Sequence, residues 1–410
     1  MKKLLSVVLA LLMLAVMLPV TAMAEDTNYC TIEGITEADG TTLKHFDTLT
    51  AAAKAWRESK GVVTEGSTFG ANNLGTVEPI VWDIYGTVPV GDGAGVVGDN
   101  GAGECIFTGG YFTPDVTVSK VTVTGHNNAT ISKTNNDKYR VSVNANEVVF
   151  ANITFEDTMR NTGNPGSLTF TNCTFKAGLR MPHAGANSTL KVENCTFTGE
   201  VASDYAIFVQ GPKEGTMSNV VLSGNKISGY QRGVNVQAGT GATVSITGNT
   251  ITNLTGKTGN GGTYGSAIQL TSGQTFNVTG NTIDTGIVNA FHFYTGLDAN
   301  VTINNNKIKA PYLLWNEANL PQDNITSSGN VLDIDNPGQA KTKTAVIPTE
   351  TVINGTTAPG TITIIVPSTE ETKPAEDQKN PSTGANDMVA AAAALMAVSA
   401  LGMAVLSRKK

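Results

Sequence analysis

Gly248-Asn-Thr-Ile251 is one of nine copies of a four-residue motif that recur between residues 128 and 332. The full set reads Asn128-Ala-Thr-Ile131, Asn152-Ile-Thr-Phe155, Asn172-Cys-Thr-Phe175, Asn194-Cys-Thr-Phe197, Gly224-Asn-Lys-Ile227, Gly248-Asn-Thr-Ile251, Gly280-Asn-Thr-Ile283, Asn305-Asn-Lys-Ile308 and Gly329-Asn-Val-Leu332. Successive copies begin 24, 20, 22, 30, 24, 32, 25 and 24 residues apart. Such a period predicts a solenoid, in which each repeat packs on its neighbours.

The residues around each motif predict three short strands per repeat, and therefore a parallel β-helix whose turns we call rungs. Apolar and polar residues alternate before the motif, as in Val244-Ser-Ile246 and Val301-Thr-Ile303, which is typical of a half-buried strand. The Gly or Asn that opens the motif predicts a one-residue bend before a second strand. A third strand lies between motifs, as in Val234-Asn-Val236 and Phe291-His-Phe293. Stacked rungs lie about 4.8 Å apart.

The second residue of the motif predicts a column of stacked amides inside the solenoid. The column comprises Asn225, Asn249, Asn281, Asn306 and Asn330. An isolated inward Asn is unfavourable, but stacked amides can satisfy one another by hydrogen bonds. In the earlier rungs the same column holds Ala129, Ile153, Cys173 and Cys195.

This architecture, over roughly the middle half of the chain, resembles the right-handed β-helix of the pectate lyase superfamily, where Asn ladders at one bend are common. The resemblance implies an all-β, right-handed parallel β-helix. In the lyases of that superfamily an Arg or Lys acts as base beside calcium-binding Asp residues, and in the hydrolases two or three Asp residues cluster. The candidates for a base are Arg160, Arg180 and His183, and the nearby carboxylates are Glu156, Asp157 and Asp204. They form neither cluster, so the sequence assigns no catalytic residues.

The two ends of the chain predict export and anchoring. Residues 1–24 read as a signal peptide, with Lys2 and Lys3 before an apolar core and a small-residue cleavage site. Residues 384–410 follow the pentapeptide Asn380-Pro381-Ser382-Thr383-Gly384 with an uncharged span and a basic tail. This order resembles a Gram-positive cell-wall sorting signal, with Asn380 in place of the usual Leu, which leaves the sortase class open. A plain C-terminal membrane anchor is the alternative.

The sorting signal implies a protein exported and anchored to the cell wall of a Gram-positive bacterium. Its partners would be sortase and peptidoglycan, with Thr383 as the residue joined to the wall and the membrane contacted only before cleavage. The product, residues 25–383, would have 22 basic and 33 acidic residues, a net charge of −11. Such a charge argues against nucleic acid as a partner. We expect a monomer.

The rest of the chain divides around the β-helix, which we expect over residues 111–335. Residues 25–110 read as an N-terminal cap and first rungs, with a capping helix over 47–60 that begins at Asp47 as N-cap. Strands are expected over 80–86 and 87–90. Residues 336–366 read as a C-terminal cap or stalk, and 367–383 as a linker through the wall. The loop 91–100 contains a G-x-G-x-x-G, but no helix follows, so we expect no nucleotide site.

The four cysteines leave two interpretations open. Cys173 and Cys195 are neighbours in one column, within reach of a disulfide, yet their parallel side chains suit two stacked thiols equally well. Cys30 and Cys105 fall near the cap, and the sequence does not establish whether they meet. No spacing suggests a metal site. We expect no cofactor, with Ca²⁺ entering only if the protein is a lyase.

The outward side of the third strands is the candidate site, which we call the third-strand face. Its central column is expected to hold Arg140, Arg160, Arg180, Phe208, Asn235, Gln269 and His292. Flanking positions hold Asp204, Tyr205, Gln210, Tyr230, Arg232, Gln237, Tyr294 and Trp315. Aromatic rings stack on sugars, while amides and guanidinium groups bond hydroxyls and carboxylates. The proposed glycan-binding residues are Arg160, Arg180, Asp204, Phe208, Tyr230, Arg232, Asn235, Gln269, His292 and Tyr294. An ordinary solvated strand face is the alternative.

These features predict an adhesin or glycan-binding surface protein, with an acidic polysaccharide or host glycan as the preferred ligand because of the Arg column. A carbohydrate-active enzyme, either a polysaccharide lyase or a glycoside hydrolase, is the second hypothesis, because a fold hosts sites without implying one. A passive surface stalk is the third.

Overall fold

The structure is a computed structural model of the 410-residue chain. It describes residues 27–60, 76–77, 79–91, 107, 117–132, 145–160, 166–181, 185–199, 204–212, 215–259, 262–340, 345–353 and 356–364. The predicted signal peptide, the linker and the sorting signal lie outside these residues, as do Cys105, Arg140 and His183. Within the described ranges, no helix combines the length and the apolar composition needed to cross a bilayer.

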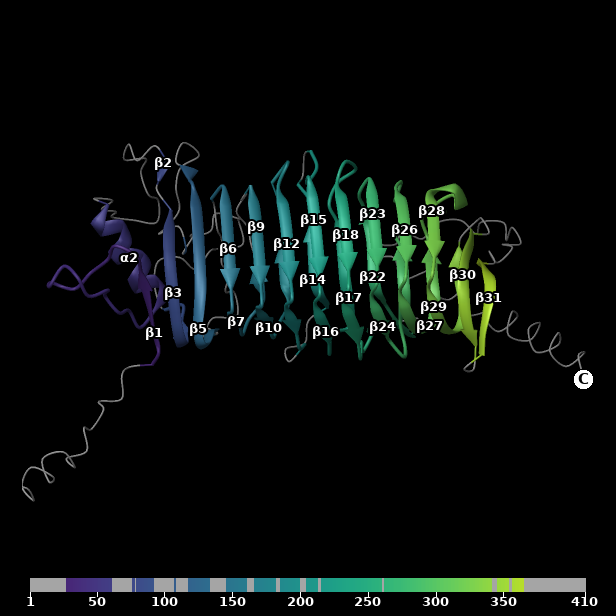
Figure 1. Ribbon diagram of the computed structural model, residues 1–410, viewed down its shortest axis with the longest axis horizontal. Helices are drawn as coiled ribbons and strands as arrows, with labels where there is room; N and C mark the ends of the chain where they lie inside the picture. The colour runs from purple at the N-terminus through teal and green to yellow at the C-terminus, as the bar shows by residue number, and fades with distance from the viewer. Residues whose placement is uncertain are drawn as a thin grey trace, which may run out of the picture.

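The strands stack along one axis in three parallel series, as the motif predicts (Figure 1). The first series, before each bend, is β6 (Glu147–Ala151), β9 (Ser167–Thr171), β12 (Thr189–Glu193), β15 (Asn219–Ser223), β18 (Thr243–Thr247), β23 (Thr275–Thr279), β26 (Asn300–Asn304) and β28 (Ile325–Ser328). The second, after each bend, is β7 (Thr154–Phe155), β10 (Thr174–Phe175), β13 (Thr196–Phe197), β16 (Lys226–Ser228), β19 (Thr250–Thr252), β24 (Thr282–Asp284), β27 (Lys307–Asn316) and β29 (Val331–Ala340).

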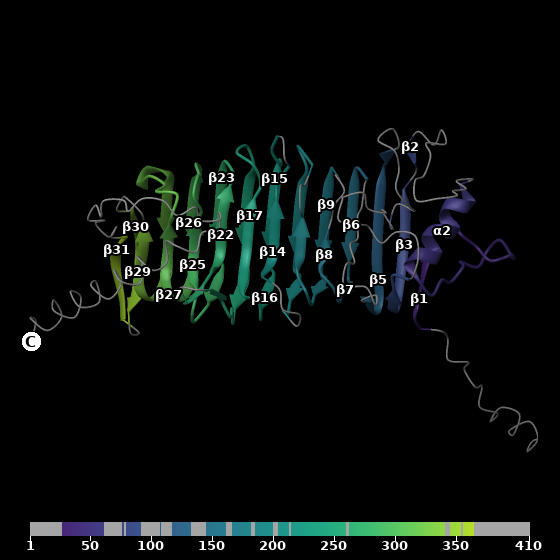
Figure 2. The same ribbon diagram turned by 180° about the vertical axis from the view of Figure 1, so that it is seen from behind.

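The third series completes each rung and is labelled in the rear view (Figure 2). It consists of β8 (Met159–Arg160), β11 (Leu179–Met181), β14 (Tyr205–Gln210), β17 (Arg232–Gln237), β22 (Ser266–Ser272), β25 (Asn289–Phe293) and the second half of β27. Because these pairings are parallel and in register, a residue type placed at one position of the repeat forms a column along the whole axis.

The bend that opens each motif has a left-handed backbone in all nine copies. The φ angles are 58° at Asn128, 59° at Asn152, 52° at Asn172, 55° at Asn194, 65° at Gly224, 63° at Gly248, 68° at Gly280, 55° at Asn305 and 63° at Gly329. Gly and Asn are the residues that adopt this conformation most readily, which explains why every copy has one or the other at this position. Gly at position 329 has a steric cause too, because a Cβ there would lie 2.3 Å from Oδ1 of Asn305.

The inward Asn residues form the predicted hydrogen-bonded ladder. The Nδ2 of Asn249 donates to Oδ1 of Asn281 at 2.9 Å, and its backbone N–H donates to the same oxygen at 2.9 Å. Its second Nδ2 proton goes to the Leu222 carbonyl at 2.9 Å. The same pattern links Asn225 to Asn249, Asn281 to Asn306 and Asn306 to Asn330. The buried amides of the ladder are therefore satisfied within the interior.

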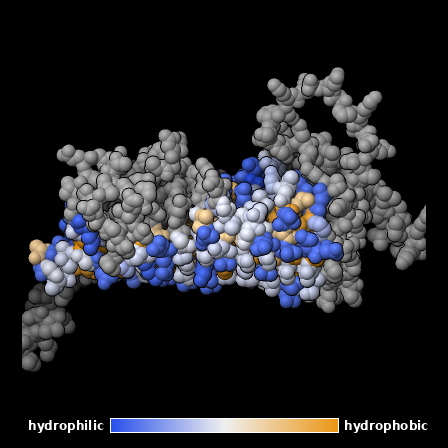
Figure 3. Space-filling model, turned by 90° about the horizontal axis from the view of Figure 1, so that it is seen from above, coloured by the Kyte–Doolittle hydropathy of each residue, from blue (hydrophilic) through white to orange (hydrophobic). Residues whose placement is uncertain are grey.

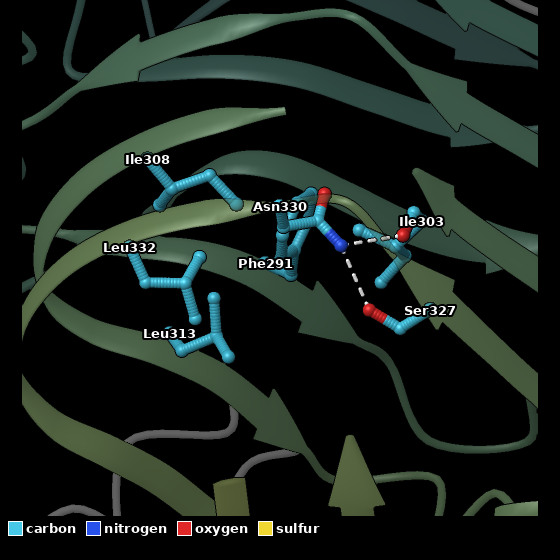
Figure 4. Close-up of a pocket in the computed structure, with 7 residues that line it drawn as sticks. All are labelled: Phe291, Ile303, Ile308, Leu313, Ser327, Asn330 and Leu332. Atoms are coloured by element: carbon cyan, nitrogen blue, oxygen red, sulfur yellow. Dashed lines mark hydrogen bonds between the residues drawn. The ribbon is translucent and has the colours of Figure 1, made fainter. Parts of the chain in front are cut away.

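The ladder ends at the C-terminal side of the interior beside a small pocket (Figure 4). The pocket is lined by Phe291, Ile303, Ile308, Leu313, Ser327, Asn330 and Leu332. The Nδ2 of Asn330 donates to the Ile303 carbonyl at 2.7 Å and to Oγ of Ser327 at 2.8 Å. Ser327 stands where earlier rungs place Ile303 or Val278. Its hydroxyl therefore supplies the acceptor that a following Asn would provide.

The N-terminal rungs have an aromatic interior instead. Phe155, Phe175 and Phe197 stack with ring centroids 5.1 and 4.6 Å apart. Cys173 and Cys195 hold the ladder position as free thiols, so the thiol interpretation is confirmed. The Sγ of Cys195 accepts the backbone N–H of Cys173 at 3.4 Å, as an Asn Oδ1 does further along. Burial raises the pKa of Cys173.

Further strands extend the sheet at both ends of the solenoid. At the N-terminal end, β1 (Tyr29–Ile32) pairs antiparallel with β3 (Ile80–Pro89), and β3 pairs with β5 (Lys120–Ser132), which joins the first two series. At the other end, β30 (Ala345–Ile353) pairs with β29, and β31 (Thr356–Ile364) pairs antiparallel with β30. Strands β30 and β31 therefore continue the sheet beyond β29. The remaining elements are β2 (Thr76–Val77), β4 (Thr117–Val118) and the 3₁₀ turn η2 (Gln322–Asn324).

The predicted capping helix is α2 (Leu49–Ser59), which buries Leu49, Ala52, Ala53 and Trp56 as expected. Its N-cap differs from the prediction. The hydroxyl of Thr48 accepts the Ala51 N–H at 3.1 Å, so Thr48 and not Asp47 caps the helix. Both residue types are good caps, and the sequence places them side by side.

Candidate functional site

The third-strand face has the column that the sequence predicts. Strand pairing aligns the backbone of Arg160 with Arg180, then with Phe208, Asn235, Gln269, His292 and Trp315. Strands β8, β14, β17, β22 and β25, which carry this column, are labelled in Figure 2. The side chain of Arg160 lies outside the described residues, and that of Arg180 is half-buried.

Three members of the column are far less exposed than an outward strand position suggests. Asn235 and Gln269 are each 6% exposed, and His292 is 7% exposed. The expectation that Asn235 is an exposed Asn and that His292 is a surface His is therefore wrong. Their polar atoms are bonded to neighbours on the same face: Thr271 Oγ1 donates to Asn235 Oδ1 at 2.9 Å, and Gln269 Nε2 donates to Thr271 Oγ1 at 3.3 Å.

Tyr230 does not belong to this face. The residue is 1% exposed, and its hydroxyl donates to the Phe175 carbonyl at 3.0 Å, inside the solenoid. Tyr230 follows the bend residue Gly229, whose φ is 79°, and this local turn directs the ring inward. The prediction that Tyr230 contacts a glycan is therefore wrong, and the sequence period gave no sign of this inward turn.

Asp204, which precedes β14, lies at the centre of a cluster of charges on the face. Arg232 binds it with a forked pair of hydrogen bonds, one of them from Nε to Oδ1 at 2.6 Å and the other from Nη2 to Oδ2. Lys257 Nζ donates to the same Oδ2 at 3.3 Å. Burial acts to raise the pKa of Asp204, but the hydrogen bonds and charge of Arg232, with those of Lys257, outweigh it and hold the pKa below its usual range.

Arg232 is held by the ring of Tyr205 as well as by the carboxylate of Asp204. Its guanidinium carbon lies 3.8 Å from the ring centroid of Tyr205, a cation–π contact. The Tyr205 hydroxyl donates to Gln269 Oε1 at 2.8 Å, and burial raises the pKa of this phenol well above its ordinary value. Gly265 leaves the space for the arginine stem, because a Cβ there would lie 2.8 Å from Arg232 Cγ.

His292, which lies on β25, is oriented by neighbours on two sides. Its ring stacks on Trp315 with centroids 4.2 Å apart, and its Nε2 lies 2.9 Å from Oε2 of Glu317. Tyr294, which is exposed, lies edge-on to the same ring at 5.5 Å. Burial lowers the pKa of His292, against the raising effect of Glu317, and the charge of Arg232 lowers it further. The imidazole is therefore held in its neutral form at neutral pH.

The carboxylates of the face do not converge. Asp204 flanks β14, and Glu317 follows β27, so the two lie four rungs apart, or about 19 Å. The paired carboxyl groups of glycoside hydrolases are about 5–9.5 Å apart. Asp204 and Glu317 cannot form such a pair. Among the described residues, no group of three or more His, Cys, Asp or Glu side chains is placed to hold a metal ion.

Sequence reasoning missed Lys257 and Glu317, for different reasons. Lys257 lies on an inserted hairpin, β20 (Lys257–Gly259) and β21 (Gly262–Tyr264), within the longest of the eight intervals between motifs, the one of 32 residues. That long spacing was the available signal. Glu317 follows the strand by one residue, and nothing in its local sequence indicates that it reaches His292 on the preceding rung.

Much of the described surface seen from above is hydrophilic (Figure 3). In the view of Figure 3, blue and white residues predominate over the described part of the surface, and hydrophobic residues are scattered among them. The described residues with large exposed hydrophobic side chains are Leu43, Ile287, Tyr294 and Val331. Tyr294 is the member of this set that belongs to the third-strand face.

Comparison with known proteins supports the fold. Residues 159–332 match the family model described as a right-handed β-helix region. Together with the parallel register of the strands, this match supports a right-handed β-helix over that part of the chain. No curated protein and no solved structure matches the chain.

Proposed function

We propose that the protein is an exported, wall-anchored surface protein that binds an acidic glycan through its third-strand face. The observation that carries the proposal is the cluster of Arg232, Lys257 and Asp204, in which two cations share one carboxylate and Arg232 lies over the ring of Tyr205. Cations recognise the carboxylate or sulfate groups of a glycan, and aromatic rings stack on its sugars.

The face is rigid enough for such recognition. Its side chains project from strands that are hydrogen-bonded to rungs on both sides, and several are tied to one another by side-chain hydrogen bonds. A binding surface that is already ordered loses little conformational entropy when a ligand binds. From Phe208 to Trp315 the column covers about 20 Å, enough for several sugar units.

Titration of the protein with polyuronates, sulfated glycans and neutral glycans tests the proposal. We expect binding to acidic glycans that weakens as salt is added, because screening reduces the attraction between exposed charges. Arg160→Ala combined with Arg180→Ala should weaken binding further, whereas Lys226→Ala, an exposed Lys on the second-strand side, should not. Silence across the whole panel would leave the passive stalk as the better hypothesis.

Anchoring is tested separately from binding. The basis is the ordered arrangement of Asn380-Pro-Ser-Thr-Gly384, the uncharged span and the basic tail. Thr383→Ala should move the protein from the peptidoglycan fraction to the membrane or the medium, and a variant that remains covalently bound to the wall would contradict the sorting signal.

One observation favours an enzyme as the second candidate function. His292 is neutral, buried and oriented by Glu317, which is the arrangement of a general base. Release of unsaturated or reducing products from an acidic glycan by the wild-type protein, lost in His292→Gln, would establish turnover. Binding without any product would exclude it and leave the binding function in place.

A further inference from the structure

We propose that Lys257 and Arg232 together form the seat for one oxyanion of the ligand, a carboxylate or sulfate group on a sugar. This inference rests on the proposed glycan binding and specifies the contact that selects acidic chains. Asp204 carries one negative charge and its two partners carry two positive charges, so the cluster retains a net positive charge. The side chain of Lys257 is 41% exposed and that of Arg232 is 15% exposed, which leaves the lysine on the solvent side.

The cluster also has hydrogen-bond donors to spare. A guanidinium has five N–H groups and an ammonium has three. Arg232 uses two of its five on Asp204, and Lys257 uses one of its three. Within the described part of the chain, the remaining donors of both side chains have no protein partner. Water meets them in the free protein, and an oxyanion with several acceptor lone pairs can replace that water.

The inserted hairpin is what brings Lys257 to this place. Just before β20, the Thr255 N–H donates to the Tyr230 carbonyl at 2.8 Å and the Gly256 N–H donates to the Gln231 carbonyl at 2.9 Å. These two bonds fix the start of the hairpin to the chain that leads directly into Arg232. The antiparallel pairing then sets Tyr264 opposite Lys257. A ring beside a cation suits a sugar that carries a charged group.

Contacts of Arg232 with Asp204 and Tyr205 preorganise the seat. Asp204 holds the plane of the Arg232 guanidinium with two bonds, and the Tyr205 ring lies against its face. The backbone adds a further link, because the Arg232 N–H donates to the Asp204 carbonyl at 2.8 Å. The ligand therefore meets donors whose directions are already set, so less entropy is lost on binding.

The experiment compares Lys257→Gln with the matched control Lys226→Gln in the full chain. Each protein is titrated with a polyuronate, with a sulfated glycan, and with the carboxyl-reduced or desulfated form of the same chain. We expect Lys257→Gln to raise the Kd for the acidic form by roughly three- to tenfold, about the effect of losing one charge-assisted hydrogen bond near the surface. The Kd for the neutral form should not change. A preference for the polyuronate or for the sulfated chain identifies the source of the oxyanion.

A second measurement uses the pKa of His292 to report an anion bound at Arg232. The charge of Arg232 contributes to the lowered pKa of His292, so an anion bound at Arg232 should raise that pKa. The chain has only four histidines, which allows His292 to be assigned in NMR titrations with and without ligand. Arg232→Lys keeps the charge but not the fork, and should weaken binding without abolishing it.

The outcomes separate this inference from the function on which it rests. If no acidic glycan binds the wild-type protein, the proposed function fails. If acidic glycans bind but Lys257→Gln and Lys226→Gln behave alike, the function stands and the seat is elsewhere. An unchanged His292 pKa in the saturated complex would likewise remove the anion from Arg232.

Discussion

Two columns of side chains run along the solenoid in the same register, one inside and one on the third-strand face. Over five successive rungs the inner column repeats one residue, with Asn at positions 225, 249, 281, 306 and 330, and each of the first four donates to the next in the same way. The outer column changes at every rung from Phe208 to Trp315. A uniform column can serve only as a support, because no position differs from the next. A varied column on the same support can recognise a ligand.

Asn249→Leu, in the inner column, should cause the largest loss in the free energy of unfolding. The change removes the acceptor for the N–H and Nδ2 of Asn225, and it removes the side-chain donor to the Leu222 carbonyl and one of the two donors to Asn281 Oδ1. Each buried group left without a partner costs about 1–3 kcal/mol, so we expect a loss of roughly 3 kcal/mol in the free energy of unfolding. Urea unfolding measures it. A loss below about 1 kcal/mol would mean that the ladder contributes little.

The second effect is a pH dependence that arises in the outer column. The pKa of His292 is lowered in the folded protein, so the unfolded chain binds more protons as the pH falls through about 6.5. The free energy of unfolding should therefore decrease on acidification, by at most about 1.4 kcal/mol per pH unit. His292→Gln should remove this part of the slope, whereas His45→Gln, at an exposed position of the cap, should keep it. Identical slopes in all three proteins would show that His292 is not buried in solution.

Asn235→Leu should have a smaller effect than Asn249→Leu, although both side chains are buried. Asn235 accepts one bond from Thr271 and has a second side-chain hydrogen bond with Tyr205, and both hydroxyls left behind can turn to another partner. We expect a loss of about 1 kcal/mol, measured by the same urea unfolding. Equal losses at positions 235 and 249 would remove the distinction between the two columns as far as stability is concerned.

Arg180→Ala should change stability least. The side chain is half-buried, and within the described residues it makes no ion pair or hydrogen bond. Surface changes of this kind usually stay within about 0.5 kcal/mol. A clear loss in thermal unfolding would assign Arg180 a structural role and weaken its place in the proposed binding face.

The sequence predicts the solenoid well because one local requirement repeats. Each motif needs a left-handed bend followed by an inward residue, and both are visible in four letters, as at Gly248 and Asn249. Register follows from the same letters, since a strand displaced by one residue would bury its polar side. The period therefore sufficed to place the outer column from Arg180 to His292.

Burial on the outer face could not be predicted in this way. Strand parity directs Asn235 outward, but it does not show that residues from neighbouring rungs cover it, as Thr271 does. The same limit explains why Tyr230 was misplaced. These outcomes depend on contacts between residues about 25 to 60 positions apart, such as Tyr230 with Phe175, for which the repeat has no rule.

The inner ladder has a direction, and this direction matters while the chain is being made. From Asn225 to Asn306, the backbone N–H and one Nδ2 proton donate to the Oδ1 of the next Asn, which comes later in the sequence, as Asn281 donates to Asn306. A ribosome produces the chain from its N-terminus. Each Asn rung therefore exists for a time before its acceptor has been synthesised, and a chain interrupted after Asn281 ends on two unmatched donors. Completion waits for the last rung, where Ser327, already present three residues earlier, receives the amide of Asn330.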